Sequence, residues 1–252
     1  MARLSVRYNP AVQADIAPVP GRPEQAAVRS MFDRIAPRYD LLNRLLSAGI
    51  DVRWRRAAAD WLELGPSSRV LDLCTGTADL LIEVLGRDPS HRGVGVDLSS
   101  GMLVRAAGKL AAHGLSARSA LASGDAEHLP LRDACFDGAL VAFGIRNVGD
   151  QPRALCELRR VLKPGGRLVV LEFSMPRGVV GILYRFYFGQ VLPRIGRLVS
   201  GDGSAYSYLP ASVAVFPEPP AFGALLEQAG FGRVRFRALT AGIAHLYRAE
   251  VP

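Results

Sequence analysis

The sequence predicts an α/β protein with a seven-stranded, mostly parallel sheet, helices on both faces of that sheet and a helical cover at the N-terminal end. Three observations lead to this fold class. From Arg69 onward, short apolar runs alternate with segments of helical character. Two more apolar runs follow the last of these helices near the C-terminus. Residues 24–64, ahead of the first run, have the character of two or three helices.

Five apolar runs form the predicted parallel part of the sheet, because strands that are joined by helices run in the same direction. Helices are expected at 78–85, 101–112 and 152–161, and the turn KPGG at 163–166 closes the last of them. A further helix near 221–229 precedes the two final strands. The seven predicted strands are RVLDL, GVGVDL, SALASGD, FDGALVAF, RLVVLEF, RVRFRAL and AHLYRAE.

We expect one domain at residues 24–252, preceded by a flexible arm at 1–23. The arm contains several prolines and has no apolar core of signal-peptide length, so it is predicted to be loose. The helical cover occupies 24–64 and is expected to break near Pro37 and Gly49.

A substrate-side insertion is expected at 176–215, after the fifth strand. Its apolar stretch, GVVGILYRFYFGQVLPRIGRLV, is interrupted by three arginines, whereas a membrane span takes roughly 18 or more apolar residues without charges. The helical spacing fits an interfacial helix or a lid over an apolar site, and a core helix with arginines at its solvent edge is the alternative. Tyr206 and Tyr208 are candidates to line a substrate site, with aromatic packing as the competing explanation.

The composition, 49% hydrophobic and 21% charged over 252 residues, is typical of a globular protein. The formal net charge of +8 comes mainly from arginine, which suits attraction to the phosphates of nucleic acid or anionic lipid. The three cysteines are far apart and lack metal-ligand spacing, and the four histidines show no such spacing either. We therefore expect a reduced, cytoplasmic compartment and no bound metal.

Polar residues follow three of the predicted strands, at the ends where open parallel sheets bind their ligands. After the first strand, Gly76 allows close approach of the backbone, and Thr77 offers a hydroxyl and an amide. Asp97 ends the second strand and can accept hydrogen bonds from both hydroxyls of a ribose, with a helix cap as its alternative role. Asp125 can accept from an adenine amino group while the Ala126 amide contacts a ring nitrogen, and a turn is the alternative role of Asp125.

Together with Asp72 and the KPGG turn, these strand ends describe an S-adenosylmethionine pocket better than a nicotinamide pocket, because the first loop lacks the full G-x-G-x-x-G pattern. The most specific segments of the chain are MFDRIAPRYDLLNRLLSAGID, FGIRNVGD, LEFSMP, VLPRIGRLVSGDGSAYSYL and GIAHLYR. Over residues 28–248 the chain resembles the class I S-adenosylmethionine-dependent methyltransferases, and among these the C-methyltransferases of menaquinone and ubiquinone biosynthesis.

This resemblance implies the Rossmann-like fold of class I methyltransferases and S-adenosylmethionine as the cofactor. The cofactor contacts that it implies are Tyr39, Gly76, Thr77, Asp97, Asp125, Ala126 and Ala142. The chain departs from the family pattern at Ala78, where many members have Gly and where a side chain would crowd the methionine moiety. Ala241, Tyr247 and the segment FPEPP also differ, which weakens an assignment of substrate contacts near the C-terminus.

Arg146 and Asn147 follow the fourth strand, where its apolar run ends. Methylation of a quinol ring needs a nucleophilic carbon, which forms as the neighbouring hydroxyl, with a reference pKa of about 10, loses its proton. We predict that Arg146 stabilises the developing quinolate, that an ordered water takes the proton and that Asn147 fixes the geometry. In the alternative, Arg146 pairs with Asp150 or another surface carboxylate and Asn147 caps the following helix.

The resemblance thus implies C-methylation of a prenylated quinol, with demethylmenaquinol to menaquinol as the expected reaction. The expected partners are this quinol and a transient anionic membrane surface at the inner face of the membrane. Methylation in ubiquinone biosynthesis, or of a soluble phenolic or polyketide metabolite, is the alternative.

Two other classes are disfavoured. Enzymes that methylate base amines carry Asn/Asp-Pro-Pro-aromatic where this chain has AFGIRN, so nucleic acid is not expected as a partner. A non-enzymatic binding protein would lose the acidic strand ends, which are intact. The ring type, the tail length and the oligomeric state stay open, with a homodimer as one candidate.

Overall fold

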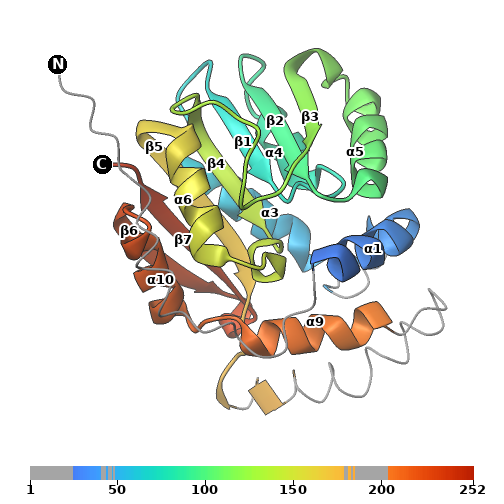
Figure 1. Cartoon of the computed structure of the whole chain (residues 1–252), viewed down its shortest axis with the longest axis vertical. Helices are drawn as coiled ribbons and strands as arrows, with labels where there is room; N and C mark the ends of the chain where they lie inside the picture. The colour runs from blue at the N-terminus through green and yellow to red at the C-terminus, as the bar shows by residue number, and fades with distance from the viewer. Residues whose placement is uncertain are drawn as a thin grey trace.

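The computed structural model describes residues 25–40, 44, 47, 49–178, 181–182, 184 and 204–252. Its strands are β1 (Arg69–Leu73), β2 (Arg92–Asp97), β3 (Ser119–Ser123), β4 (Phe136–Ala142), β5 (Leu162–Phe173), β6 (Gly232–Leu239) and β7 (Ala244–Glu250). They form one sheet in the order β3-β2-β1-β4-β5-β7-β6 (Figure 1). β1 to β5 are parallel, and β7 runs antiparallel between β5 and β6. The predicted fold class is confirmed.

The helices that the sequence predicts between and after the strands are all present, within two residues at each end. The α-helices of the described residues are α1 (Gln25–Ile35), α3 (Ile50–Leu62), α4 (Asp79–Leu85), α5 (Ser100–Ala112), α6 (Gln151–Val161), α9 (Ser204–Val215) and α10 (Pro219–Gln228). Short 3-10 turns lie at η2 (Ala36–Arg38), η3 (Ser116–Arg118), η4 (Ile145–Asn147) and η6 (Thr240–Gly242).

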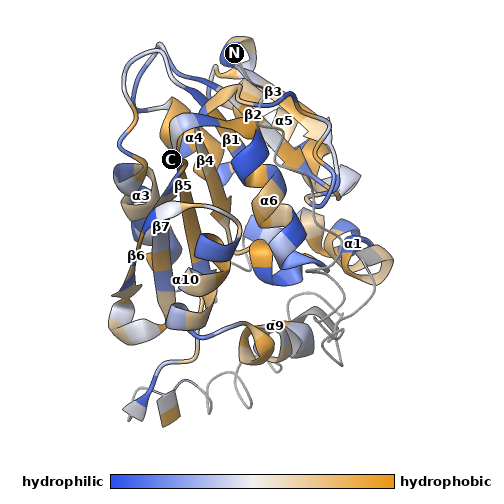
Figure 2. Cartoon of the chain, turned by 60° about the vertical axis from the view of Figure 1, so that its left-hand side comes forward, coloured by the Kyte–Doolittle hydropathy of each residue, from blue (hydrophilic) through white to orange (hydrophobic). Residues whose placement is uncertain are grey.

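The central strands β1, β4 and β5 are buried on both faces, because alternate residues of each strand point to opposite sides and helices cover each side. In β1, Leu71 and Leu73 belong to the core that α6 and α10 cover, whereas Val70 belongs to the core that α3 and α4 cover. Figure 2 shows the strands as mostly hydrophobic and the helices as mixed in character. With both faces covered, a ligand can reach the sheet only at the ends of its strands.

The strand order reverses between β1 and β4, so that the chain leaves β1 toward β2 and β3 and later returns to its other side. At such a switch point the loops that follow the two strands diverge and leave a crevice. Helices α1 and α9 lie at this end of the sheet, and they contact each other (Figure 1).

One turn predicted from the sequence is part of a strand. The KPGG segment at 163–166 was expected to close the third helix as a separate turn, yet β5 already begins at Leu162. The Gly165 N–H donates to the Val251 carbonyl at 2.9 Å, and the Val251 N–H donates to the Gly166 carbonyl at 2.9 Å. Pairing with the C-terminal end of the chain therefore draws the glycines into the sheet, which the local sequence cannot reveal.

The N-terminal cover includes α1, η2 and α3. Pro37 lies in η2, and Gly49, with φ of +76°, precedes α3. The arm at 1–23 and most of the insertion at 176–215 lie outside the described residues. None of the described helices combines the length and the apolar character that crossing a membrane requires.

Candidate active site

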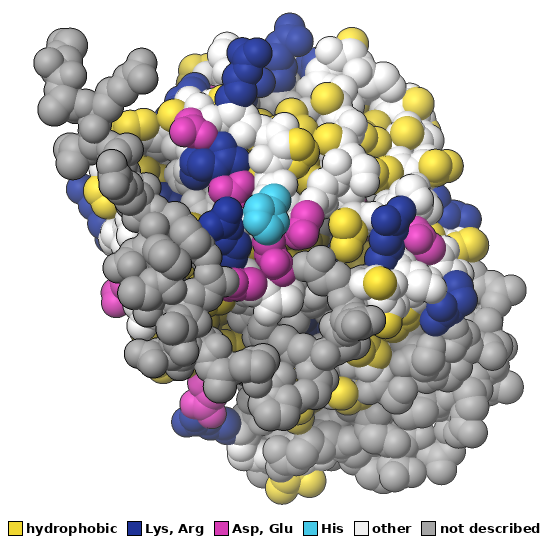
Figure 3. Space-filling view, viewed as in Figure 1, with side chains coloured by type: hydrophobic (Ala, Val, Ile, Leu, Met, Phe, Trp, Pro, Cys, Tyr) yellow, Lys and Arg dark blue, Asp and Glu magenta, His cyan; other side chains and the backbone are white. Residues whose placement is uncertain are grey.

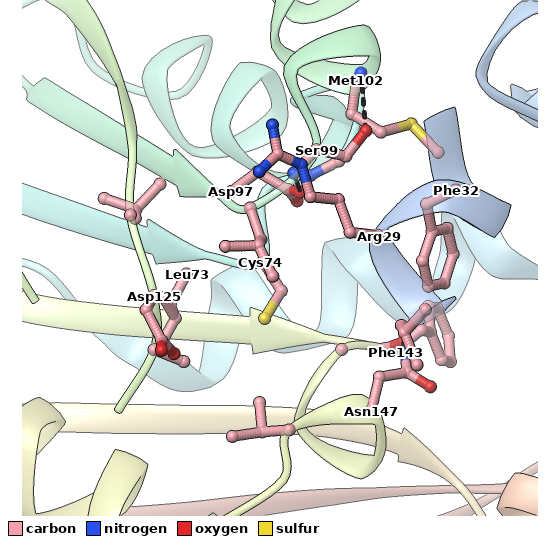
Figure 4. Close-up of a pocket in the computed structure, with 18 of the residues that line it drawn as sticks. Arg29, Phe32, Leu73, Cys74, Asp97, Ser99, Met102, Asp125, Phe143 and Asn147 are labelled. Atoms are coloured by element: carbon pink, nitrogen blue, oxygen red, sulfur yellow. Dashed lines mark hydrogen bonds between the residues drawn. The ribbon is translucent and has the colours of Figure 1, made fainter. Parts of the chain in front are cut away.

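A cavity lies at the carboxyl ends of β1, β2 and β4, and we refer to it as the strand-tip cavity. Six of the seven predicted cofactor contacts line it, together with Asn147 (Figure 4). These six are Tyr39, Gly76, Asp97, Asp125, Ala126 and Ala142. Thr77 and Arg146 are not among the lining residues. The topology of the sheet thus brings together side chains that are up to about a hundred residues apart.

The loop after β1 forms one wall of the strand-tip cavity. Gly76 has φ of +55°, a left-handed backbone conformation that other residues rarely adopt, so glycine permits the backbone turn of this wall. The buried Thr77 hydroxyl instead donates to Asp40 at 2.6 Å and accepts from Lys109 at 3.1 Å. Thr77 therefore ties this loop to the N-terminal cover and to α5.

Ala78 was expected to crowd the methionine moiety. The structure places its fully buried methyl group in the core formed by α4 and α5, and Ala78 is not among the residues that line the strand-tip cavity. Its backbone is left-handed, with φ of +66°, at the residue before α4. Alanine in place of glycine at position 78 therefore affects the backbone conformation of the loop and does not narrow the strand-tip cavity.

Asp97 projects from the end of β2 into the strand-tip cavity. One carboxylate oxygen accepts from the Ser99 N–H at 2.8 Å, and the other accepts from the Gly76 N–H at 2.8 Å. Each oxygen keeps a further lone pair for an incoming hydroxyl. Burial raises the pKa of this carboxyl, and the backbone N–H groups oppose the rise. Ser99 caps α5, since its hydroxyl accepts from the Met102 N–H at 3.1 Å, so Asp97 is free of that role.

Asp125 serves the turn that was its alternative role and also lines the strand-tip cavity. Its carboxylate accepts from the Glu127 N–H at 2.9 Å. Ala126 follows it at the same wall. The hydrogen bond fixes the carboxylate in its own loop and leaves other lone pairs for a ligand donor.

Asp72, the third predicted acidic strand end, lies beneath the strand-tip cavity. Its side chain is 1% exposed and accepts from the Thr75 hydroxyl at 2.6 Å. Desolvation raises the pKa of this carboxyl to about 7. Asp72 is not among the lining residues, so it supports the loop after β1 from below.

Helix α1 supplies lining residues that the sequence reasoning missed. Arg29 and Phe32 face the strand-tip cavity (Figure 4). Asp33, on the same helix, accepts from the Ser99 hydroxyl at 2.5 Å and from the Gly101 N–H at 3.0 Å. These hydrogen bonds lower the pKa of the Asp33 carboxyl. The signal was present in the specific segment MFDRIAPRYD, yet no spacing rule relates Asp33 to a loop 66 residues away.

Arg146 lies behind the wall of the strand-tip cavity. Its guanidinium pairs with Glu172 at 2.8 Å, and the two side chains are 6% and 0% exposed. The guanidinium also donates to the Phe143 carbonyl, and its Nε donates to the Ser212 hydroxyl at 3.2 Å. In the alternative role, Arg146 was expected to pair with Asp150 or another surface carboxylate. The structure pairs it with Glu172, a buried carboxylate near the end of β5.

Asn147 faces the strand-tip cavity beside Phe143 (Figure 4). Its Oδ1 accepts from the Tyr208 hydroxyl of α9 at 2.8 Å, and its Nδ2 lies 3.4 Å from the Phe143 carbonyl. The cap of α6 is Asp150, whose carboxylate accepts from the Arg153 N–H at 2.9 Å. Asn147 therefore does not have the capping role that was its alternative.

The hydrogen-bond acceptors and apolar side chains of the strand-tip cavity fit an adenosine group. Asp97 offers acceptors for a diol at one wall, and Asp125 offers an acceptor for an amino group at another. Apolar side chains between them suit a flat ring, namely Val96, Leu98, Met102 and Ala126. Within the described residues, no three His, Cys, Asp or Glu side chains gather as metal ligands.

Comparison with known proteins identifies the family. The profile of the ubiE/COQ5 methyltransferase family matches residues 22–250. The chain belongs to this family. It is therefore a methyltransferase, as its sequence predicts, and the ubiE/COQ5 profile spans the N-terminal cover, the whole sheet and the insertion.

Relatives in the ubiE/COQ5 family are similar along most of the chain. Demethylmenaquinone methyltransferase of Thermus thermophilus is 51% identical over 224 residues, which are 88% of this chain and 100% of that protein. The ubiquinone/menaquinone biosynthesis C-methyltransferase UbiE of Syntrophotalea carbinolica is 53% identical over 220 residues, which are 87% of this chain and 92% of that protein.

Solved structures share the fold at low identity. The [4+2]-cyclase SpnF superposes with a TM-score of 0.69 at 19% identity and covers 94% of this chain and 99% of its own. An S-adenosylmethionine-dependent methyltransferase of Thermotoga maritima superposes with a TM-score of 0.63 at 20% identity and covers 89% of this chain and 99% of its own. At such identities the likeness concerns the fold alone.

Proposed function

We propose that this methyltransferase transfers a methyl group from S-adenosylmethionine to a ring carbon of a prenylated quinol, converting demethylmenaquinol to menaquinol. The observation that carries the proposal is the 51% identity to a demethylmenaquinone methyltransferase along that protein's whole length, combined with intact acidic residues in the strand-tip cavity. A benzoquinol of ubiquinone biosynthesis is the second candidate, because the UbiE relatives are named for both quinones.

The cofactor would lie along the ends of β1, β2 and β4. Asp97 would bind the ribose hydroxyls, and Asp125 and the Ala126 amide would bind the adenine edge. Tyr39 and Gly76 would border the methionine moiety, next to Ala142 at the end of β4. When bound, S-adenosylmethionine supplies an electrophilic methyl group on a sulfonium centre. Alignment of this group with the ring carbon is the main catalytic contribution of the protein.

Asn147 would contact the quinol oxygen next to the methylated carbon, because it is the member of the Arg146–Asn147 pair that lines the strand-tip cavity. An amide N–H that donates to this oxygen favours the quinolate over the neutral hydroxyl. The Arg146 charge is largely offset by Glu172, so its direct effect on a quinolate is weaker than the sequence suggested. Arg146 would act as a positioning residue by holding the Phe143 carbonyl and α9, and a water would take the proton.

Purified protein with S-adenosylmethionine and a short-tailed demethylmenaquinol tests this function. We expect the mass of the quinol to rise by one methylene unit, and we expect a benzoquinol or a soluble naphthol to react more slowly. The Asp97→Ala variant is the control for cofactor dependence. No methylation of either prenylated quinol by the wild type, or preference for the soluble naphthol, would contradict the proposal.

Attachment to an anionic membrane surface is the second part of the proposal. Met175, Ile182 and Val215 are exposed apolar residues around the insertion, at 38%, 61% and 50%. Close to them, Arg177 is 83% exposed and pairs with Glu218 at 2.7 Å. Apolar side chains next to an arginine, on a chain of net charge +8, suit a shallow contact with anionic lipid.

Co-sedimentation with vesicles tests the membrane contact. Binding is expected to rise with the fraction of anionic lipid and to fall with salt. Ile182→Ser is expected to weaken it, and Val104→Ser, which changes an apolar residue 73% exposed on α5, is the matched control. Binding that ignores lipid charge and salt would contradict the proposal.

Figure 3 shows Lys and Arg interspersed with Asp and Glu among the described residues of one face of the protein. The absence of a nucleic-acid partner and the homodimer both stay predictions. An electrophoretic shift assay with RNA tests the first of them, and light scattering tests the second.

A further inference from the structure

The two ends of one helical turn of α9 contact Arg146 and Asn147, which lie in η4, the short 3-10 turn after β4. Tyr208 and Ser212 are four residues apart and so lie on the same face of the helix. The Tyr208 hydroxyl donates to Asn147 Oδ1 at 2.8 Å, and the Arg146 Nε donates to the Ser212 hydroxyl at 3.2 Å. The insertion is therefore joined to the strand-tip cavity through the same pair of side chains that the proposed reaction uses.

From this contact we propose that Tyr208 is a positioning residue, which fixes the amide of Asn147 so that its N–H group, and not its carbonyl oxygen, faces the substrate oxygen. The inference rests on the proposed methylation of a quinol. It assigns to Tyr208 an effect on the reaction that passes through Asn147, without contact between Tyr208 and the reacting atoms.

Hydrogen-bond complementarity supports this orientation of the amide. The Phe143 carbonyl can only accept, and it lies 3.4 Å from Asn147 Nδ2. If the amide were rotated by half a turn, Oδ1 would face the Phe143 carbonyl, and two acceptors would meet without a proton between them. In this orientation Oδ1 accepts from Tyr208 and one N–H of Nδ2 points to the Phe143 carbonyl, so the second N–H of Nδ2 is the donor that Asn147 can offer to the strand-tip cavity.

The surroundings of the pair hold this arrangement in place. The Phe143 carbonyl also accepts from the Arg146 guanidinium, which is itself held by the buried carboxylate of Glu172. The Phe143 ring stacks on Phe173 with their centroids 4.3 Å apart, so the carbonyl cannot turn away freely. Tyr208 is the member of this set that comes from the insertion, and it makes the amide orientation depend on the docking of α9.

The substrate class follows from the donor that is presented. An N–H group aimed into the strand-tip cavity selects a ring oxygen that carries lone pairs and gains negative charge, as a quinol or phenol oxygen does beside the reacting carbon. A substrate whose neighbouring group can only donate would meet an N–H group and would be disfavoured.

A double-mutant cycle tests this role with quinol methylation as the readout. The proteins are the wild type, Tyr208→Phe, Asn147→Ala and the double variant. The control is Tyr247→Phe, which removes a buried hydroxyl that has no hydrogen-bond partner among the described residues. Calorimetric titration with S-adenosylhomocysteine and a thermal melt accompany each kinetic measurement.

We expect Tyr208→Phe to lower kcat about tenfold, which corresponds to one hydrogen bond, while the dissociation constant of S-adenosylhomocysteine changes by less than about twofold. In the Asn147→Ala background the same change is expected to cost nothing further, because the group that Tyr208 positions is gone. Tyr247→Phe is expected to match the wild type.

Wild-type kcat in Tyr208→Phe, or penalties that multiply in the double variant, would overturn the role of Tyr208 and leave the proposed function intact. A loss of kcat in Tyr208→Phe that accompanies a lowered melting temperature, and that Tyr247→Phe reproduces, would also overturn it. A wild type that methylates no prenylated quinol would overturn the proposed function, and this inference with it.

Discussion

The two halves of the strand-tip cavity are built differently. On the cofactor side, Asp97 and Asp125 accept hydrogen bonds from backbone N–H groups of loops that follow the strands themselves. On the substrate side, Arg146 and Asn147 are held by side chains from β5 and α9. The paired strands therefore hold the acidic residues of the first half, to which the N-terminal cover adds Arg29, Phe32 and Tyr39, whereas the second half requires the insertion to dock.

This difference teaches where each half is sensitive to change. Backbone N–H groups remain when neighbouring side chains are replaced, so the positions of Asp97 and Asp125 depend little on the side chains around them. The substrate side depends on a chain of side chains in which each member holds the next. Substitutions can therefore break one half and spare the other.

The largest expected effect concerns the buried ion pair of the substrate side. Glu172→Ala leaves the Arg146 guanidinium buried without its carboxylate, so we expect the free energy of unfolding to fall by about 3–5 kcal/mol in urea denaturation. The control is Asp133→Asn, at an ion pair with Arg160 in which the Asp133 side chain is 76% exposed. In Asp133→Asn the free energy of unfolding is expected to change by no more than about 1 kcal/mol. Equal losses in the two variants would contradict this contrast.

The next effect concerns Asp72 and the pH dependence of stability. Its pKa is raised from 3.8 to about 7, so between these pH values the folded protein keeps a proton that the unfolded chain has lost. The contribution of Asp72 to the free energy of unfolding is therefore most favourable below pH 4. As the pH rises to 7, the free energy of unfolding falls by on the order of 4 kcal/mol because of this group.

Asp72→Asn removes this titration and keeps an acceptor for Thr75. Relative to the wild type, the variant should become more stable as the pH rises from 4 to 8, as measured by urea denaturation at each pH. A difference in the free energy of unfolding that stays constant from pH 4 to 8 would show that Asp72 does not cause the pH dependence of stability.

The third effect separates the two halves by their ligands. Asp97→Ala removes the carboxylate that we propose accepts two charge-assisted hydrogen bonds from a ribose, so we expect the dissociation constant of S-adenosylhomocysteine to rise about 100-fold in calorimetric titration. Asn147→Ala should change that constant by less than about threefold, which is below the effect of one hydrogen bond, while it lowers kcat. Similar affinities of Asp97→Ala and Asn147→Ala for S-adenosylhomocysteine would mean that cofactor binding does not distinguish the two halves of the strand-tip cavity.

The smallest effect concerns the contact of α1 with α5. Asp33→Ala removes the acceptor of the Ser99 hydroxyl and the Gly101 N–H, so we expect cofactor affinity to fall about threefold to tenfold. Asp60→Ala is the control, at a carboxylate of α3 that is 67% exposed. If Asp33→Ala binds the cofactor as Asp60→Ala does, the contact does not hold α1 over the strand-tip cavity.

Most of the cofactor side could be predicted from the sequence, because a strand shows itself in its apolar alternation and its carboxyl end follows directly. Tyr39, Asp97 and Asp125 all line the strand-tip cavity as expected. Thr77 does not, because its hydroxyl meets Asp40 and Lys109, which are 37 and 32 residues away in the chain. A hydroxyl in a loop has several directions available, and the local sequence does not choose among them.

The sequence by itself determined the strands, their mostly parallel direction and the acidic and amide residues near their ends, since these follow from patterns within each strand and its connecting segment. Only the tertiary structure decided that Arg146 turns to Glu172 and that Tyr208 holds Asn147. A buried charged side chain forms an ion pair with the opposite charge that the fold places beside it. A hydroxyl donates a hydrogen bond to an acceptor that the fold brings within reach. Both choices are made by packing between β5, α9 and the end of β4, which no local pattern encodes.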